Sequence, residues 1–153
     1  MPRTIRATMK LSSPAFEPGG EIPVRYTCDG EDINPPLFIQ GVPEHARSLA
    51  LIVDDPDAPQ GTMTHWLLWN LDPRTTEIPE DSVPPQARQG KNSFGTLGYE
   101  GPCPASTTHR YRFQLYALNT RLTLPQGTRA ELEQAIQHTF IDQVTIVGRY
   151  GRE

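Results

Sequence analysis

Acidic side chains that could take part in chemistry are concentrated in one short segment. Asp54-Asp55-Pro56-Asp57-Ala58-Pro59 places three carboxylates within four positions, and its two prolines restrict the backbone. Like charges this close repel one another unless a positive group or a hydrogen-bond donor offsets them. We therefore expect at least one of the three, Asp57 in particular, to cap a turn or to pair with an arginine. The others could serve in a binding or catalytic site.

Two histidines stand at the start of predicted strands. His65 precedes a continuous apolar run, and His109 precedes a segment of alternating apolar and polar residues. A buried imidazole needs a hydrogen-bond partner or a cavity, so a satisfied core histidine is the simpler interpretation of His65 alone. Strand alternation places His109 and Tyr111 on one face. If Asp55 lies near His65, its charge should raise the pKa of that imidazole, and anion binding should weaken as the pH climbs through that value.

Residues 98–104, Gly-Tyr-Glu-Gly-Pro-Cys-Pro, form a third candidate segment. Its glycines can adopt positive φ and turn successive amide N–H groups toward an anion, although a tight connection is the alternative interpretation. The chain contains neither GxxxxGK[ST] nor a GxGxxG motif after a predicted strand. Nucleotide binding of those kinds is therefore not indicated.

Other chemistries have weaker support from the residue spacing. Asp55, His65 and His109 could form a metal site with two histidines and one carboxylate, but no HxH or HExxH spacing favours one. Cys103 with His109 lacks the surroundings of a thiol nucleophile, and no GxSxG motif indicates a serine triad. Asp55 and Asp57 could perform acid-base hydrolysis only at a separation that the sequence does not give. We expect no metal, no cofactor and no enzymatic activity.

Composition predicts one domain spanning residues 1–153. The formal net charge is −4, with 14 scattered Lys and Arg residues, which argues against a nucleic-acid surface. No apolar stretch approaches the roughly 20 residues of a membrane span, so no integral membrane association is expected. No apolar segment follows the N-terminal arginines, which favours a cytoplasmic location. Cys28 and Cys103 are expected to be small buried side chains in a reducing compartment, with one bridge as the alternative.

The elements that must position these residues are mostly strands. Alternation predicts half-buried strands, whereas continuous apolar runs predict strands covered on both faces. A capping box of Thr128 and Glu131 begins a helix, on which Leu132, Ile136 and Phe140 should cover the sheet. The predicted strands are residues 5–11, 22–26, 49–53, 66–69, 111–118 and 144–147, and the predicted helix is 129–140.

The candidate segments, taken together, resemble a known family. Their order and spacing are similar to those of the phosphatidylethanolamine-binding protein (PEBP) superfamily, and three further segments resemble its bacterial and archaeal branch, the Raf-kinase-inhibitor-like YbhB/YbcL proteins. The resemblance extends from about Met9 to Tyr150. It is carried by Asp55-Pro56-Asp57-Ala58-Pro59, Gly61-x-x-x-His65-Trp66, Gly98-Tyr99-x-Gly101-Pro102-Cys103-Pro104, His109-Arg110-Tyr111-x-Phe113-x-Leu115-Tyr116-Ala117-Leu118, Ser13-Pro14-Ala15-Phe16, Ile22-Pro23-x-x-Tyr26-Thr27-Cys28-Asp29-Gly30 and Pro35-Pro36-Leu37.

This resemblance implies a mainly β fold with a large central antiparallel sheet, a second smaller sheet and one or two short helices. It also implies a pocket for an anion, such as phosphate or a phospholipid head group, and makes Ala58–Pro59 a candidate cis peptide. Thr107 stands where the family often has glycine. The implied ligand-binding residues are Asp55, Asp57, Pro59, His65, Gly98, Tyr99, Gly101, Pro102, His109 and Tyr111.

Three functions are compatible with this resemblance. The first is non-catalytic binding of a small anionic ligand, with regulation of a kinase or a protease as one use of it. The second is inhibition of a kinase or serine protease through a surface other than the pocket. The third, with least support, is hydrolysis of a phosphorylated or ester substrate. A homodimer is compatible with each of them.

Overall fold

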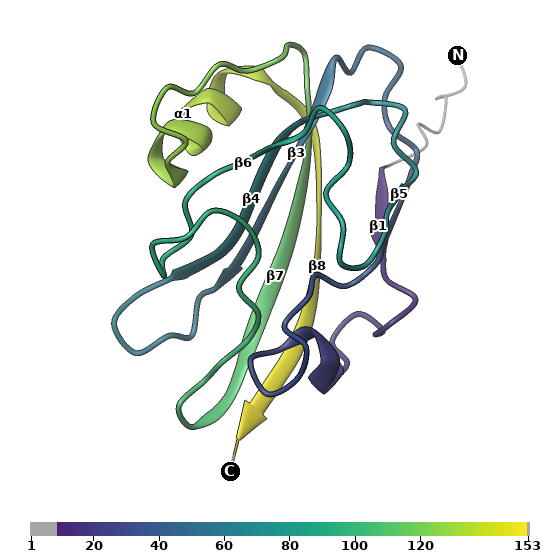
Figure 1. The fold of residues 1–153 in the computed structure, drawn as a ribbon. Coiled ribbons are helices and arrows are strands. Elements are labelled where there is room, and N and C mark those ends of the chain that lie inside the picture. The colour runs from purple at the N-terminus through teal and green to yellow at the C-terminus, as the bar shows by residue number, and fades with distance from the viewer. Residues whose placement is uncertain (1–8, 153) are drawn as a thin grey trace, which may run out of the picture.

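The computed structural model describes residues 9–152 (Figure 1). Strands dominate, and the segments predicted from continuous apolar runs or long alternation are all strands. One α-helix and one 3₁₀ turn complete the regular structure. The elements are β1 (Lys10–Ser12), η1 (Val24–Tyr26), β2 (Leu37–Gln40), β3 (Ser48–Asp55), β4 (Met63–Leu71), β5 (Glu77–Ile78), β6 (Arg88–Gln89), β7 (Thr107–Leu118), α1 (Arg129–Thr139) and β8 (Phe140–Arg152).

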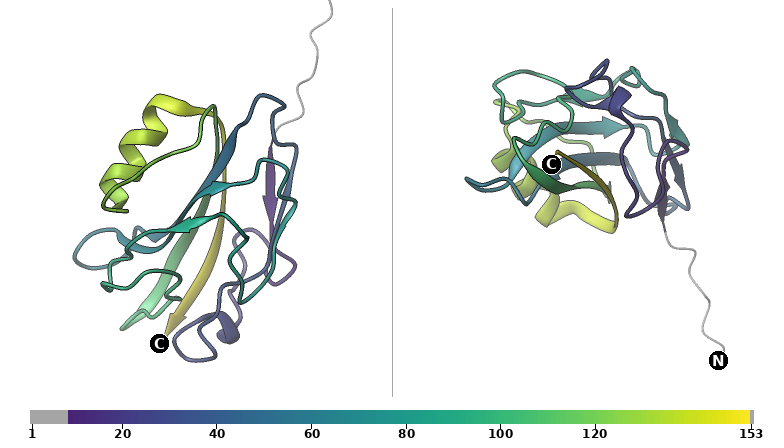
Figure 2. Two further views of the ribbon diagram at one scale, coloured as in Figure 1. Left: turned by 45° about the horizontal axis from the view of Figure 1, so that its top comes forward. Right: turned by 90° about the horizontal axis from the view of Figure 1, so that it is seen from below.

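The strands form two antiparallel sheets. A small sheet has the order β1-β2-β5, and a large sheet has the order β6-β4-β3-β7-β8. The small sheet packs on one face of the large sheet and α1 packs on the other, as the two views of Figure 2 show. The mainly β architecture with a large and a small sheet is therefore confirmed.

The central strand β3 is buried along its whole length because both of its faces are covered. Leu49, Leu51 and Val53 face the small sheet, whereas Ala50 and Ile52 face α1. The strand ends in Asp54 and Asp55, whose side chains follow the same alternation. Two adjacent carboxylates are thereby directed to opposite faces of the large sheet.

The capping box of α1 is confirmed. The Thr128 hydroxyl accepts the Glu131 N–H at 3.2 Å, and the Glu131 carboxylate accepts the Thr128 N–H at 3.4 Å. Leu132 and Ile136 are buried against the sheet, as predicted. Phe140 is 50% exposed and begins β8, so its assignment to the helix was wrong. The helix ends one residue earlier, where the backbone becomes extended.

Two other predicted strands need correction. Residues 24–26 form the 3₁₀ turn η1 instead of a strand, because the Thr27 N–H and hydroxyl both donate to the Val24 carbonyl and close a turn. Pro23, at the start of the turn, has no N–H to give to a ladder. Most of the predicted strand 5–11 lies outside the described residues, and its last two residues belong to β1.

The expectation that Cys28 and Cys103 are unpaired was wrong. Their sulfur atoms form a disulfide that joins positions 75 residues apart, linking the η1 region to the segment that precedes β7. Such bonds are typical of oxidising compartments. The cysteines therefore no longer support the cytoplasmic expectation. Within residues 9–152 no helix has the length and apolar character needed to cross a membrane.

Candidate functional site

Asp55 and His109 form a buried pair at one end of the large sheet. Asp55 ends β3, His109 lies near the start of β7, and the two strands run antiparallel side by side. The Asp55 Oδ2 lies 2.6 Å from the His109 Nδ1, with side chains 5% and 8% exposed. Because a carboxylate accepts hydrogen bonds, the Nδ1 of His109 donates. The His109 Nε2 has no hydrogen-bond partner among the described residues and is the ring atom left for a ligand.

His65, on β4, is held from the other side by the loop before β7. Its Nδ1 donates to the Glu100 carbonyl at 2.6 Å, and the Glu100 N–H donates to the His65 carbonyl at 3.0 Å. Burial lowers the pKa of His65 below its usual value, and the smaller raising effects of this hydrogen bond and of the Asp55 charge do not reverse it. The expected rise in the His65 pKa was therefore wrong, because burial outweighs the raising effect of the Asp55 charge.

Tyr111 lies between the two imidazoles. Its ring contacts that of His65 edge-on at a centroid distance of 5.4 Å and stacks beside that of His109 at 6.4 Å. The residue is 1% exposed, yet its hydroxyl has no hydrogen-bond partner among the described residues. Burial raises the Tyr111 pKa most, followed by the charge of Asp55 and the close approach of the Asp55 carboxylate to the hydroxyl, so the hydroxyl keeps its proton at neutral pH. The site thus contains a buried donor that lies near the Asp55 carboxylate but makes no hydrogen bond of ordinary geometry to any described residue.

These side chains border a cavity of about 290 Å³. Five of the predicted ligand-binding residues line it, namely Asp55, Pro59, His65, His109 and Tyr111. Apolar side chains fill much of the remaining wall, and the Phe94 ring lies edge-on to His65 at 5.3 Å. The other lining residues, which the sequence analysis did not include, are Ala58, Gln60, Met63, Phe94, Cys103, Pro104 and Ala105.

Asp57 does not border the cavity. Its carboxylate accepts the Arg110 backbone N–H at 2.8 Å and two bonds from the Arg110 guanidinium at 2.8 and 3.0 Å, which lowers the Asp57 pKa to about 2. The Asp57 N–H in turn donates to Asp55. Pairing with an arginine, expected from the sequence, is thus confirmed, and it fixes the loop that carries Pro59.

Residues 98–102 of the glycine-rich segment do not line the cavity, and the Glu100 and Gly101 amides are already bonded, which fits the alternative of a tight connection better than an amide nest. The Gly101 N–H donates to Asp32 at 2.7 Å, and the Pro102 carbonyl accepts the Cys28 N–H at 3.1 Å. The Tyr99 hydroxyl donates to the Tyr26 carbonyl at 2.6 Å. Gly98 has a φ of +118° and, like the other three residues, does not line the cavity.

The cavity-lining residues that were not predicted are positioned by contacts that are not evident from the sequence. Phe94 is placed by a turn in which the Asn92 carboxamide accepts the N–H groups of both Phe94 and Thr96. An aromatic residue inside an Asn-Ser-Phe-Gly turn is the only signal that could have indicated it. Cys103 reaches the wall because the disulfide holds it there.

Two backbone details of the surrounding loops bear on the resemblance. No peptide bond among residues 9–152 is cis, so Ala58–Pro59, the candidate cis peptide, is trans. Thr107 has a φ of +62°, the left-handed conformation that favours glycine. A threonine here adopts the backbone conformation for which the family's usual glycine is better suited.

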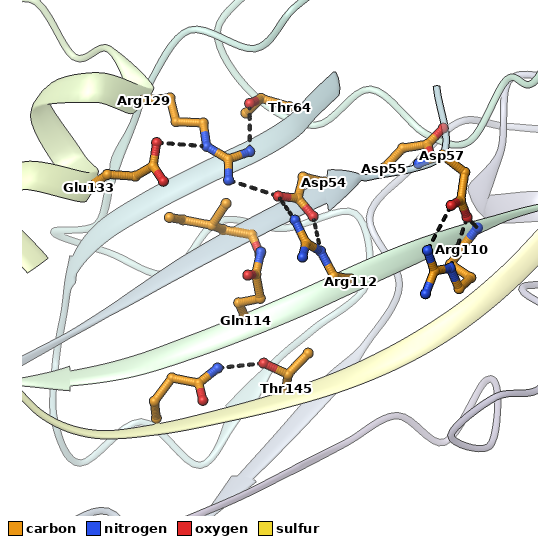
Figure 3. A network of polar contacts seen from close by, with 12 residues as sticks. Asp54, Asp55, Asp57, Thr64, Arg110, Arg112, Gln114, Arg129, Glu133 and Thr145 are labelled. Atoms are coloured by element: carbon orange, nitrogen blue, oxygen red, sulfur yellow. Dashed lines mark hydrogen bonds and ion pairs between the residues drawn. The ribbon is translucent and has the colours of Figure 1, made fainter. Parts of the chain in front are cut away.

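Asp54 belongs to a separate polar network on the α1 face (Figure 3). Its carboxylate, which is fully buried, accepts bonds from the Arg112 guanidinium at 2.7 and 2.8 Å and contacts the Arg129 guanidinium at 2.8 Å. Arg129 also donates to Thr64 and pairs with Glu133. Arg129, the first residue of α1, thus forms an ion pair with the central strand β3. The charge of Asp54, the third of the clustered carboxylates, is balanced by two guanidinium groups.

The lowered pKa of His65 predicts a loss of stability in weak acid. The unfolded chain takes up a proton near pH 6.5, the folded chain only at lower pH, so the free energy of unfolding should fall as the pH drops below 6.5. Urea unfolding at pH 7.5 and 5.5 should show a smaller fall for His65→Gln than for the native chain. His45→Gln, at an exposed position, is the matched control and should leave the fall unchanged. An unaltered fall in His65→Gln would contradict the assignment.

Comparison with known proteins places this geometry in a family. The model of the phosphatidylethanolamine-binding protein family matches residues 12–151. A UPF0098 protein of Archaeoglobus fulgidus is 51% identical over 147 residues, which cover 90% of this chain and 50% of that protein, so the chain spans half the length of that relative. A UPF0098 protein of Methanothermobacter thermautotrophicus is 48% identical over 151 residues, covering 94% of this chain and 99% of the relative.

Solved structures agree. The putative PEBP homolog CT736 of Chlamydia trachomatis has a TM-score of 0.91 at 38% identity, covering 96% of this chain and 99% of its own. E. coli YbcL, titled a new member of the mammalian PEBP family, has a TM-score of 0.89 at 28% identity, covering 96% and 100%. Sequence and fold lead to the same conclusion: the chain belongs to the phosphatidylethanolamine-binding protein family.

Proposed function

We propose that this protein binds a small anionic ligand, of the phosphate-ester type, in the cavity between His65, His109 and Tyr111, and releases it unchanged. The observation that carries the proposal is the Tyr111 hydroxyl, which is buried, protonated and without a partner among the described residues. Leaving a buried donor unsatisfied costs about 1–3 kcal/mol. A ligand oxygen that accepts from it would remove this cost.

His109 supplies a second contact to the ligand. Asp55 fixes the orientation of the ring through Nδ1 and leaves Nε2 as the ring atom that can contact a ligand. The Nε2 atom then donates to a ligand oxygen when the ring is protonated. Two donors from one strand, Tyr111 and His109, thus converge on one anionic group, which is how a small desolvated site binds an anion in a chain whose net charge is negative.

His65 and the apolar wall define the rest of the ligand. Because its pKa is lowered and its Nδ1 carries the hydrogen bonded to Glu100, neutral His65 offers Nε2 as an acceptor for a ligand hydroxyl or ammonium. Met63 and Phe94 supply apolar surface beside these polar atoms. The preferred ligand therefore combines an anionic group, a hydrogen-bond donor and a short apolar portion, as in a lipid head group.

Calorimetric titration with inorganic phosphate and with phosphorylethanolamine tests the proposal. Tyr111→Phe should weaken the binding of both by about tenfold or more, because it removes a hydrogen bond to a charged group. Tyr116→Phe is the matched control, since Tyr116 lies on the same strand but packs toward α1 and Phe140, and it should bind as the native protein does. Native-like affinity in Tyr111→Phe, or no binding by the native chain, would refute the proposal.

A further inference from the structure

A second, larger cleft of about 640 Å³ lies on the opposite face of the large sheet, the face that carries α1. Its floor is Trp69 and Asn70 of β4. One wall is formed by β6 and Lys91, which is the second residue after it, and the other by residues 121–127, which lead into α1. It shares no lining residue with the cavity around Tyr111.

The two walls are fixed to the floor and to each other. The Asn70 carboxamide donates to the Leu122 carbonyl at 2.8 Å and accepts the Leu122 N–H at 2.7 Å. The Lys91 N–H donates to the Gly127 carbonyl at 3.0 Å. Gly90 packs so closely on that carbonyl that a Cβ there would lie 2.5 Å from its oxygen. The walls therefore meet at one end of the cleft, which is preformed and closed there.

The charge in this cleft is positive and uncompensated. Arg88 and Lys91 come from one wall and Arg121 from the other, and none of the three forms a salt bridge with any described residue. No aspartate or glutamate lines the cleft. The charge of Arg121 contributes to lowering the Asp72 pKa, but the Asp72 carboxylate is hydrogen-bonded to Arg74. By contrast, six arginines elsewhere have carboxylate partners: Arg25, Arg74, Arg110, Arg112, Arg129 and Arg152.

Three cations on the walls of one cleft, with no acidic residue in its lining, give the cleft a positive character that suits a negative ligand. Because Arg88 and Lys91 lie on one wall and Arg121 lies on the facing wall, a single small anionic group cannot contact all three cations. The volume falls within the range of about 300–1,000 Å³ that is typical of small-molecule sites. The closed end favours a compact ligand over an extended acidic peptide, which would have to pass through.

We propose that this cleft binds a small molecule carrying two or more phosphate groups. Arg88 and Lys91 hold one group and Arg121 holds another, while the edge of Trp69 forms the apolar floor between them. Because the cleft is separate from the cavity around Tyr111, the two sites are occupied independently. The proposal goes beyond the function given above and does not depend on it.

The experiment uses pyrophosphate as the probe and NMR as the readout. The chain has two tryptophans, so the indole N–H signal of Trp69 can be told apart from that of Trp66. Pyrophosphate should shift the Trp69 signal in native protein and in Tyr111→Phe alike, and should bind at least about tenfold more tightly than orthophosphate. Arg121→Gln should weaken pyrophosphate binding by about tenfold. Arg149→Gln, which removes an exposed arginine without a salt bridge outside the cleft, is the matched control and should bind normally.

Four outcomes would overturn the proposal. Equal weakening by Arg121→Gln and Arg149→Gln would show diffuse attraction to charge and no built site. Orthophosphate binding as tightly as pyrophosphate would remove the requirement for two phosphate groups. Loss of the Trp69 shift in Tyr111→Phe would place the probe in the other cavity. Tighter binding of hexaglutamate, lost in Arg121→Gln, would assign the cleft to an acidic peptide.

Discussion

Asp54→Asn should lower the free energy of unfolding by about 3–5 kcal/mol, the cost of breaking a buried ion pair from one side. The native carboxylate is fully buried and satisfies two guanidiniums, of Arg112 and Arg129. With an amide in its place, Arg112 loses its carboxylate partner, and Arg129 keeps only its pair with the exposed Glu133. Because Arg129 is the first residue of α1, the helix should also come away from the sheet more readily.

Urea unfolding measures the first effect, and limited proteolysis between residues 121 and 129 measures the second. The matched control is Asp72→Asn, which breaks an exposed pair with Arg74 and should cost at most about 1 kcal/mol. If Asp54→Asn were no more destabilising than Asp72→Asn, the network of Figure 3 would not stabilise the helix contact.

Removing the disulfide should cost a similar amount. For a bridge between residues 75 positions apart, the loss of chain entropy in the unfolded state corresponds to about 4 kcal/mol. The double variant Cys28→Ser/Cys103→Ser should therefore unfold at a clearly lower urea concentration than the oxidised native protein. Because Cys103 lines the cavity around Tyr111, weaker phosphate binding should accompany the change.

A reducing agent provides the internal control for this prediction. It should bring the native protein to the stability of the double serine variant and leave the variant itself unchanged. Thiol titration reports whether the native bond has been reduced. Equal stability of the oxidised and fully reduced native protein would show that the bridge contributes nothing to folding.

The sequence was most informative where a pattern was long. The continuous apolar run of residues 49–53 and the alternation of residues 111–118 both lie within strands. A hydrophobic pattern of this length is compatible with few secondary structures other than a strand that buries those side chains. β5 and β6 have two residues each, too few to establish any period. Residues 22–26 alternate like a strand, but residues 24–26 form η1, because local hydrogen bonds to the Val24 carbonyl outcompete a five-residue pattern.

The candidate site was predictable in part. Asp55, His65, His109 and Tyr111 meet because buried polar side chains at strand ends converge, and those residue types are visible in the sequence. Which carboxylate meets which imidazole was not predictable, because β3 lies beside both β4 and β7 and only the register decides. The interpretation of the glycine-rich loop as an anion-binding nest failed because a nest requires free amides. The Gly101 amide is instead bonded to Asp32, a residue 69 positions away.

The Asp54-Asp55 dipeptide gives the end of β3 two separate roles: the Asp54 side chain pairs with Arg129 of α1, and the Asp55 side chain orients His109 beside the cavity. A single inserted or deleted residue in β3 would exchange these roles, sending each carboxylate to the wrong side of the sheet. This strand should therefore keep a constant length. Substitutions around the cavity should therefore be tolerated more readily than insertions or deletions in β3.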